Sequence, residues 1–279
     1  GELDSATFTV GKKGARSELQ TVFTTMCQTD SGDMWLGTRT GHMCIKQIDS
    51  GRSKDVIRAH NGPIHAILFV PSLSKDQTQT NGYIWTTSRS GSIRLWDEKT
   101  QKQQSILQGH AGAVSTMLLV NTMAEPVYYH VWSFGYHDGT VCIWEPKKGT
   151  LLKHIDSRYG IRCACQCNET VWAGANDGTL CVFHISGRKW SSWPSHRGAI
   201  TDIKALPKHD QVWSVGVDGT LCIWHCRDAQ LLFRFQHPDN FVLTSLAVCP
   251  LEKTIWCSGT RNQGSGFVAS NNNTNNGGG

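Results

Sequence analysis

Three residues in the last third of the chain have the types that build a nucleophilic triad, namely His196, Ser214 and Asp218. In hydrolases the His removes the proton of an exposed Ser, while the Asp orients the imidazole. Ser214 instead follows Trp213 inside a short apolar run, where a strand would bury the hydroxyl and supply no oxyanion donors. The sequence also lacks G-x-S-x-G, P-loop, G-x-G-x-x-G and H-E-x-x-H motifs. We therefore expect no catalytic residues and a structural role for the three.

Cysteines offer a second chemistry, and their densest cluster is Cys163, Cys165 and Cys167. Zinc requires thiolates that converge to about 2.3 Å, whereas alternate residues on a strand lie about 6.6 Å apart. The 12 His residues show no H-x₃-H spacing either. We expect no metal and no other cofactor. The 11 Cys fall in regular apolar segments, which indicates buried thiols in a reducing, cytoplasmic setting.

The elements that would position these residues form a repeat. An apolar residue followed by Trp occurs six times, at Trp35, Trp85, Trp132, Trp172, Trp213 and Trp256. After five of these sites comes a Gly-containing turn and a second apolar run, at residues 40–45, 90–96, 138–144, 177–183 and 218–224. An Asp-Gly pair between two β-rich runs predicts a tight hairpin, because Gly adopts positive φ without steric cost.

A third element precedes the hairpins, seen at His60–Ile64, His110–Val114 and His196–Ile200. Each of these segments leads into an apolar run, and a fourth strand fits between successive copies. Four strands in a period of roughly 40 to 45 residues form the expected unit of a β-propeller blade. We therefore predict an all-β fold built of four-stranded blades.

The repeat resembles that of the WD-repeat β-propeller family, whose unit carries Gly-His near its start and ends its third strand with Trp-Asp. Gly109-His110 and Trp96-Asp97 match this pattern, and the resemblance covers residues 7–269. In the family, a His, a Ser or Thr, an Asp and a Trp form a hydrogen-bonded structural tetrad. The resemblance assigns two such tetrads, with one extra residue before the Asp in the second: His196, Ser214, Asp218 and Trp224, and His110, Ser133, Asp138 and Trp144. His60, Thr86 and Trp96 lack the Asp, because Ser90 occupies the turn.

Six repeats can be counted, and the sixth shows a second strand at 254–258, a weak third strand at 267–270 and no fourth strand. Thr7–Val10 is expected to supply that strand and to close the propeller. Six blades is our first choice, and seven, the commoner family size, stays open. We expect residues 1–270 to form the propeller and residues 271–279 a disordered Asn/Gly-rich tail. The start without Met predicts a piece of a larger signalling or regulatory protein.

The charge pattern argues against a nucleic-acid binder. The formal net charge is +5, no basic run exceeds two residues, and the recurrent Trp fall inside strands where burial is expected. No stretch of about 18 apolar residues and no apolar signal-peptide core occurs, so we expect a chain without a membrane span.

The function that these observations favour is a non-catalytic protein–protein interaction scaffold. The expected protein-binding residues either precede the turns or belong to the loops that open the blades: Arg39, Arg89, His137 and Asn176, and Arg58, Arg158, Tyr159 and Arg197. Arg captures carboxylate or phosphate in a planar bidentate manner, so the predicted ligand is an acidic or phosphorylated protein segment. The alternatives are an enzyme with a loop-built site at the channel mouth and a nucleic-acid-binding propeller.

Overall fold

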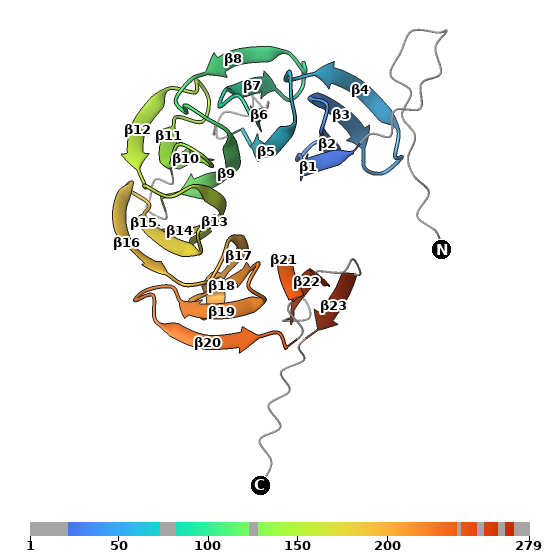
Figure 1. The fold of residues 1–279 in the computed structure, drawn as a ribbon. Coiled ribbons are helices and arrows are strands. Elements are labelled where there is room, and N and C mark those ends of the chain that lie inside the picture. The colour runs from blue at the N-terminus through green and yellow to red at the C-terminus, as the bar shows by residue number, and fades with distance from the viewer. Residues whose placement is uncertain are drawn as a thin grey trace. The chain divides into compact units, whose positions relative to one another are not determined.

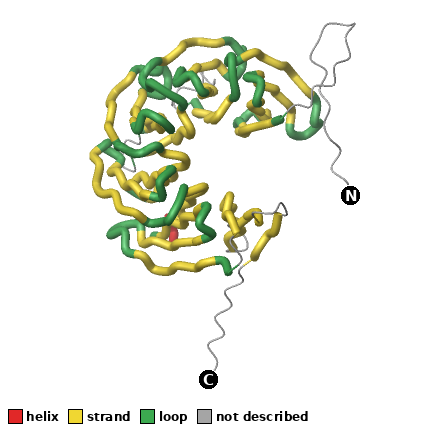
Figure 2. Tube along the Cα trace, in the orientation of Figure 1, coloured by secondary structure: helices red, strands yellow, loops and turns green. Residues whose placement is uncertain are grey.

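The structure is a computed structural model that describes residues 22–72, 82–122, 128–238, 241–249, 254–261 and 266–270, the last segment and Thr254 without side chains. Apart from one short 3₁₀ turn at Pro207–His209, all regular structure in the described residues is β-strand (Figure 2). The strands form consecutive antiparallel sheets, five with four strands and one with three (Figure 1). The fold class is therefore all-β and of the β-propeller type, as predicted.

Each sheet follows the order of the sequence. The first three sheets contain β1 (Phe23–Gln28), β2 (Asp33–Thr38), β3 (His42–Gln47) and β4 (Ser53–Arg58), then β5 (Ile64–Val70), β6 (Tyr83–Ser88), β7 (Ile93–Asp97) and β8 (Gln103–Leu107), then β9 (Val114–Asn121), β10 (Tyr129–Gly135), β11 (Thr140–Trp144) and β12 (Leu151–Asp156). The last three contain β13 (Ile161–Cys167), β14 (Thr170–Ala175), β15 (Thr179–His184) and β16 (Arg188–Pro194), then β17 (Ile200–Leu206), β18 (Gln211–Gly216), β19 (Thr220–His225) and β20 (Leu231–Gln236), then β21 (Phe241–Cys249), β22 (Thr254–Arg261) and β23 (Gly266–Ser270).

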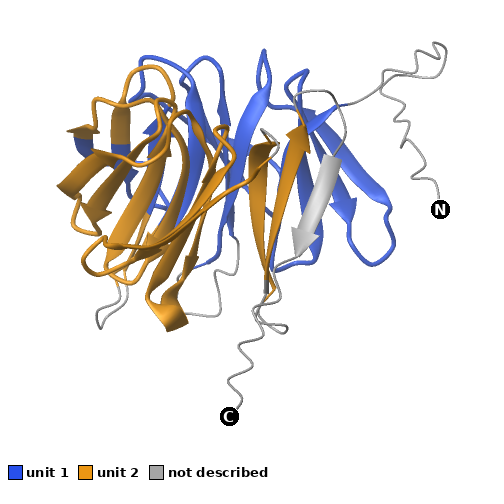
Figure 3. Cartoon of the chain, turned by 60° about the horizontal axis from the view of Figure 1, so that its bottom comes forward, with its two compact units in different colours: residues 1–119, 131–135, 142–154 blue, residues 120–130, 136–141, 155–279 orange. Residues whose placement is uncertain are grey.

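The described residues belong to two compact units (Figure 3). The first unit comprises residues 1–119, 131–135 and 142–154, and the second comprises residues 120–130, 136–141 and 155–279. The boundary between the units runs through all four strands of the third sheet. Within the second unit, β13 packs against β17 and β17 packs against β21; within the first unit, β1 packs against β5. In these three pairs, the sheets pack through their first strands.

The core lies between neighbouring sheets of a unit. In the second unit, Trp172 of β14 packs with Ile200 and Ile203 of β17, and the first-strand Cys residues join the same cluster. In the first unit, Trp35 of β2 packs with Ile64 of β5. A sheet that packs against a neighbour on both faces, as the β17–β20 sheet does, buries apolar side chains on both faces, which explains its nearly continuous apolar runs.

One expectation about the recurrent Trp is wrong for the last copy. Trp35, Trp85, Trp132 and Trp172 are fully buried, but Trp256 on β22 is 39% exposed. The cause lies in its sheet, the last one of the second unit, after which no further described sheet of that unit covers the indole. Burial of this Trp cannot be predicted from its place in the repeat alone.

The last sheet has three strands in the described part of the chain, and its third strand begins at Gly266. The predicted closing strand Thr7–Val10 and the predicted tail at residues 271–279 lie outside the described residues. Among the residues that are described, no helix has the length and apolar character needed to cross a membrane.

Candidate functional site

His196 lies in the loop between β16 and β17 and joins two sheets of the second unit. Its backbone N–H donates to the carbonyl of Gly178, in the β14–β15 turn, at 3.1 Å. Its Nε2 lies 2.8 Å from the Ser214 hydroxyl on β18, and that hydroxyl accepts a hydrogen bond from the Trp224 indole N–H at 3.0 Å. We call this arrangement the His clasp: the backbone N–H of the His contacts one sheet, and its side chain contacts the next sheet.

Asp218 completes the same set. Its carboxylate accepts hydrogen bonds from the Arg197 amide at 2.8 Å and from the Thr220 amide and hydroxyl at 3.1 and 2.6 Å. The His196 Nδ1 lies 3.3 Å from Asp218 and 2.5 Å from the Thr220 hydroxyl. Because the carboxylate only accepts, the neutral imidazole carries its proton on Nδ1 and accepts at Nε2. Thr220 is a member that the sequence analysis missed, although Thr follows Asp-Gly in three of the turns.

The electrostatics of this set favour a neutral His beside an ionised Asp. Burial raises the pKa of Asp218, but the hydrogen bonds from Thr220 and from the Arg197 amide outweigh it, so the pKa falls below its usual range. Burial lowers the pKa of His196, and the nearby Asp218 carboxylate only partly offsets this effect. A buried polar set is stable when every donor has an acceptor, which is the arrangement here.

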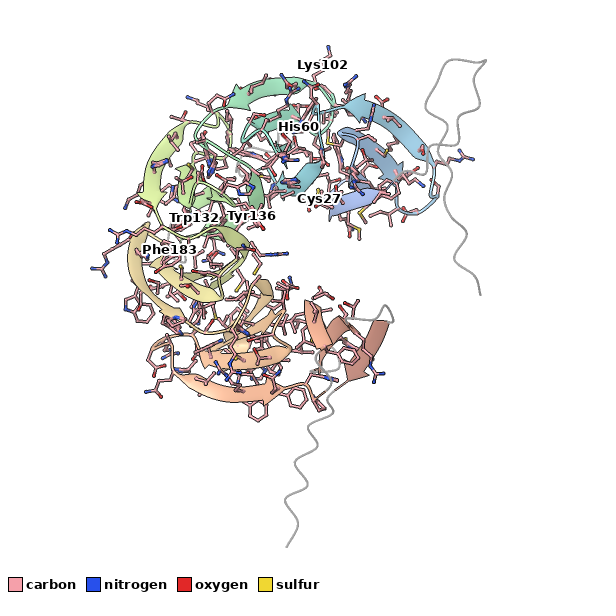
Figure 4. All side chains as sticks on the ribbon, viewed as in Figure 1. Cys27, His60, Lys102, Trp132, Tyr136 and Phe183 are labelled. Carbon is pink, nitrogen blue, oxygen red and sulfur yellow. The ribbon has the colours of Figure 1, made fainter. Side chains whose placement is uncertain are left out.

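The first unit holds a clasp without the Asp. The His60 N–H donates to the Gly41 carbonyl at 2.9 Å, and its Nε2 lies 2.8 Å from the Thr86 hydroxyl (Figure 4). The Trp96 indole N–H donates to the same hydroxyl at 3.0 Å. Burial, followed by the nearby Arg94, lowers the pKa of His60 from 6.5 to about 4.

The predicted tetrad of the third sheet is divided between the two units. In the first unit, His110 Nε2 lies 2.7 Å from the Ser133 hydroxyl, which accepts the Trp144 indole N–H at 2.8 Å. Asp138 belongs to the second unit, where its carboxylate accepts the Thr140 amide at 3.1 Å.

These hydroxyls are poorly placed for nucleophilic chemistry. Ser214 is 0% exposed, and its oxygen is engaged by both the imidazole and the indole. A nucleophile must reach a substrate carbonyl, with oxyanion donors about 3 Å from the reacting atom. The His, Ser and Asp side chains therefore form a buried set in which the hydroxyl has no access to a substrate, and their structural role stays a prediction.

The expected protein-binding residues are exposed in the first unit. Arg39 and Arg89 directly follow β2 and β6, and Arg58 is the last residue of β4. The three residues therefore lie at the strand ends that lead into the turns and into the loop opening the next sheet.

In the second unit, the structure brings several predicted residues together with three that the sequence analysis missed. Asn176 Oδ1 accepts hydrogen bonds from the Tyr136 hydroxyl at 3.1 Å and from Arg162 Nη1 at 3.3 Å. The Tyr136 ring also packs edge-on against His137, with centroids 4.6 Å apart. We call this set, with Arg158, Tyr159, Lys189 and Arg197 below, the loop surface.

The rest of the loop surface adds cations to these aromatic residues. Lys189 Nζ lies 5.0 Å from the centroid of the Tyr159 ring and donates to the Ser157 carbonyl at 3.0 Å. Arg158 and Arg197 are exposed in the loops that open β13 and β17. Tyr136, Arg162 and Lys189 had no motif to mark them, since only the fold brings them near the turns. The surface is cationic and aromatic, which suits carboxylate or phosphate ligands.

The cysteine cluster occupies β13, as the repeat predicts. All three thiols are free and buried, and burial raises the pKa of Cys163 to about 12. In the part of the chain that the structure describes, no three His, Cys, Asp or Glu side chains are arranged to hold a metal ion.

Comparison with known proteins gives distant relatives and a clear fold match. No protein family matches the chain. It is 28% identical over 185 residues to protein tipD of Dictyostelium discoideum, a match that covers 62% of this chain and 27% of tipD. It is 26% identical over 130 residues to apoptotic protease-activating factor 1 of Danio rerio, a match that covers 47% of this chain and 9% of that protein. The chain thus spans far less than two thirds of either relative.

Among solved structures, the fold is similar to that of the computationally designed Ika8 protein. The TM-score is 0.68 at 21% identity, and the match covers 90% of this chain and 72% of the Ika8 chain. At this identity the likeness bears on the fold alone.

Proposed function

We propose that this chain is a WD-repeat domain that binds other proteins without catalysing a reaction, and that its loop surface takes acidic or phosphorylated segments. The two relatives are WD-repeat-containing proteins, which supports an interaction role at this coarse level. We further propose that the domain acts in the cytoplasm as part of a larger signalling or regulatory protein.

The observation that carries the proposal is the charge of the loop surface. Arg158, Arg162 and Arg197 are exposed there, together with the half-buried Lys189. Three carboxylates nearby accept backbone hydrogen bonds: Asp156 accepts the Arg158 amide, Asp218 accepts the Arg197 and Thr220 amides, and Asp177 accepts the Thr179 amide. Among the described residues these guanidinium groups form no ion pair, so they can reach an anionic ligand. Guanidinium groups bind carboxylates and phosphates through paired hydrogen bonds.

The test is fluorescence anisotropy with two labelled peptides, Gly-Glu-Ser-Glu-Gly-Glu and the same peptide with phosphoserine. The Arg158→Gln/Arg197→Gln double variant should bind both peptides roughly tenfold more weakly than the parent. Neither substitution removes the Arg197 amide that Asp218 needs, so the fold should be unaffected.

The matched control is Arg52→Gln/Lys99→Gln, which removes two exposed cations from the β3–β4 and β7–β8 turns. It should retain the parent affinity. If both double variants bind the peptides equally weakly, the loss of affinity reflects the net charge of the domain and not the loop surface. If the Arg158→Gln/Arg197→Gln variant binds them as tightly as the parent, the peptides bind elsewhere.

A further inference from the structure

A pocket of about 430 Å³ opens in the second unit, at the strand ends opposite to the loop surface. Its walls come from the β13–β14 turn, from the end of β15 and the start of β16, and from the turn after β19. The lining residues are Cys167, Asn168, Glu169, Thr170, His184, Arg188, Trp190, Cys226 and Arg227. The pocket therefore lies between two adjacent sheets, and its volume is within the range of ligand sites.

The two turns that form the pocket are tied to each other. The Asn168 side-chain amide donates to the Asp210 carboxylate at 2.8 Å and to the Cys226 sulfur at 3.5 Å. The Cys226 amide donates to the Asp210 carbonyl at 2.7 Å. These contacts fix the relative positions of the two turns, so the pocket exists before any ligand arrives.

The floor of the pocket is apolar and uncharged. Cys167 and Cys226 are almost completely buried, and burial raises the pKa of both thiols. Neutral buried thiols behave as small apolar groups. An apolar side chain of a ligand can therefore rest on this floor without leaving a charge unpaired.

One wall carries an exposed Trp that packing does not explain. Trp193 is enclosed between Trp172 and Trp224, with ring centroids 5.9 and 5.7 Å away. Trp190, three residues earlier on the same strand, is 45% exposed and lines the pocket instead. An indole that faces a concave site can cover a large apolar area of a bound partner.

Arg188 stands beside this indole. Both residues belong to β16 and line the pocket, although a β-bulge at Trp190 interrupts the pairing of β16 with β15. The Arg188 guanidinium makes no hydrogen bond or ion pair with any described residue, unlike Arg227, which pairs with Asp210 at 2.7 Å. On the rim, the Glu169 carboxylate lies 3.9 Å from His184. Arg188 is thus the cation of the pocket that remains available to a ligand.

We propose that this pocket binds an extended segment of another protein in which an acidic side chain neighbours a large apolar one. The carboxylate pairs with the Arg188 guanidinium, and the apolar side chain packs between the Trp190 indole and the floor formed by Cys167 and Cys226. The pocket shares no residue with the loop surface, so a negative result at one site leaves the proposal for the other site untouched.

The test follows the Trp190 indole N–H signal by NMR in the ¹⁵N-labelled protein, with Trp190→Phe identifying that signal. The probe is the peptide acetyl-Glu-Leu-Glu-Phe amide, and acetyl-Lys-Leu-Lys-Phe amide serves as its charge-reversed partner. The acidic peptide should shift the indole signal in a saturable way below about 5 mM, and the basic peptide should not. Arg188→Gln should weaken the acidic peptide roughly threefold or more, whereas Arg52→Gln should have no effect.

Several outcomes would overturn the proposal. The first is that the basic peptide binds as tightly as the acidic one, and the second is that Arg188→Gln binds the acidic peptide as tightly as the parent. The third is that about 5 mM acidic peptide does not shift the Trp190 signal. If the Trp190 signal shifts when the protein concentration is raised without peptide, the pocket binds a second copy of this chain instead. A shift produced equally by inorganic phosphate would reduce the site to a simple anion site. Because Arg188 is exposed, its substitution should leave the circular dichroism spectrum unchanged.

Discussion

At the scale of single residues, Asp218 should matter most for stability within its sheet. Its carboxylate accepts hydrogen bonds from the exposed Arg197 amide and from the buried Thr220, so Asp218→Ala removes an acceptor from the buried end of the set. We expect the free energy of unfolding to fall by about 1 to 3 kcal/mol in urea denaturation. Asp177→Ala is the matched control, because that exposed turn carboxylate accepts the Thr179 amide and should cost less. An unchanged melting temperature for Asp218→Ala would contradict the structural role.

His60 makes the stability depend on pH. Burial, with Arg94 nearby, lowers its pKa from 6.5 to about 4. Between these values the unfolded chain binds a proton at this His and the folded protein does not. The free energy of unfolding should therefore decrease as the pH falls from about 6.5 to about 4, by at most about 3 kcal/mol from this residue, and this contribution should level off below.

His60→Gln cannot titrate, so its stability should vary less over the same pH range, although it should be less stable near neutral pH. The measurement is a series of urea denaturations between pH 7.5 and about pH 4. The remaining slope should include His196, whose pKa is also lowered by burial. An equally steep pH dependence in parent and variant would show that His60 is not the titrating group.

At the scale of elements, the glycine of the β14–β15 turn is tightly constrained. Gly178 has φ +88°, and an added Cβ would collide with the His196 carbonyl oxygen. Gly178→Ala should therefore lower the free energy of unfolding by about 2 kcal/mol or more. Gly51→Ala is the control, since Gly51 has φ +63° with no atom near an added Cβ and should cost only about 1 kcal/mol. Equal costs would mean that the contact between turn and loop contributes nothing.

The repeat explains why much of this architecture can be predicted from sequence. The hairpin turns and the His, hydroxyl and Trp positions recur in register, and local signals such as Asp-Gly suffice to find them. The pocket cannot be found in this way, because Cys167 and Cys226 meet only when two sheets pack. Arg162 and Lys189 also reach the loop surface through packing rather than through spacing. Trp256 is an error of the opposite kind: its place in the repeat predicts a buried indole, but its neighbours leave that indole partly exposed.

At the scale of the whole molecule, the second unit presents two candidate sites that share no residue, although Lys189 of the loop surface lies between Arg188 and Trp190 of the pocket on β16. Their side chains share no hydrogen-bond partner, so their energetic effects should be additive. We expect Arg188→Gln to leave anisotropy binding of the phosphoserine peptide unchanged, and Arg158→Gln/Arg197→Gln to leave the Trp190 shift unchanged. Competition between the two peptides, or loss of both activities in either variant, would show that the sites are one or are coupled.

The His clasp has a consequence for how the chain is made. In each clasp the carbonyl of a turn glycine accepts hydrogen bonds from residues that follow later in the sequence, as Gly178 does from Ser195 and His196. During synthesis from the N-terminus, a sheet leaves the ribosome before the amides that satisfy its turn. The last hydrogen bonds of its turn therefore form only with the first residues of the following repeat. The residue whose backbone N–H makes this contact also carries the imidazole that meets the hydroxyl of the next sheet. We therefore expect each sheet to be completed only after the start of the next repeat has been synthesised.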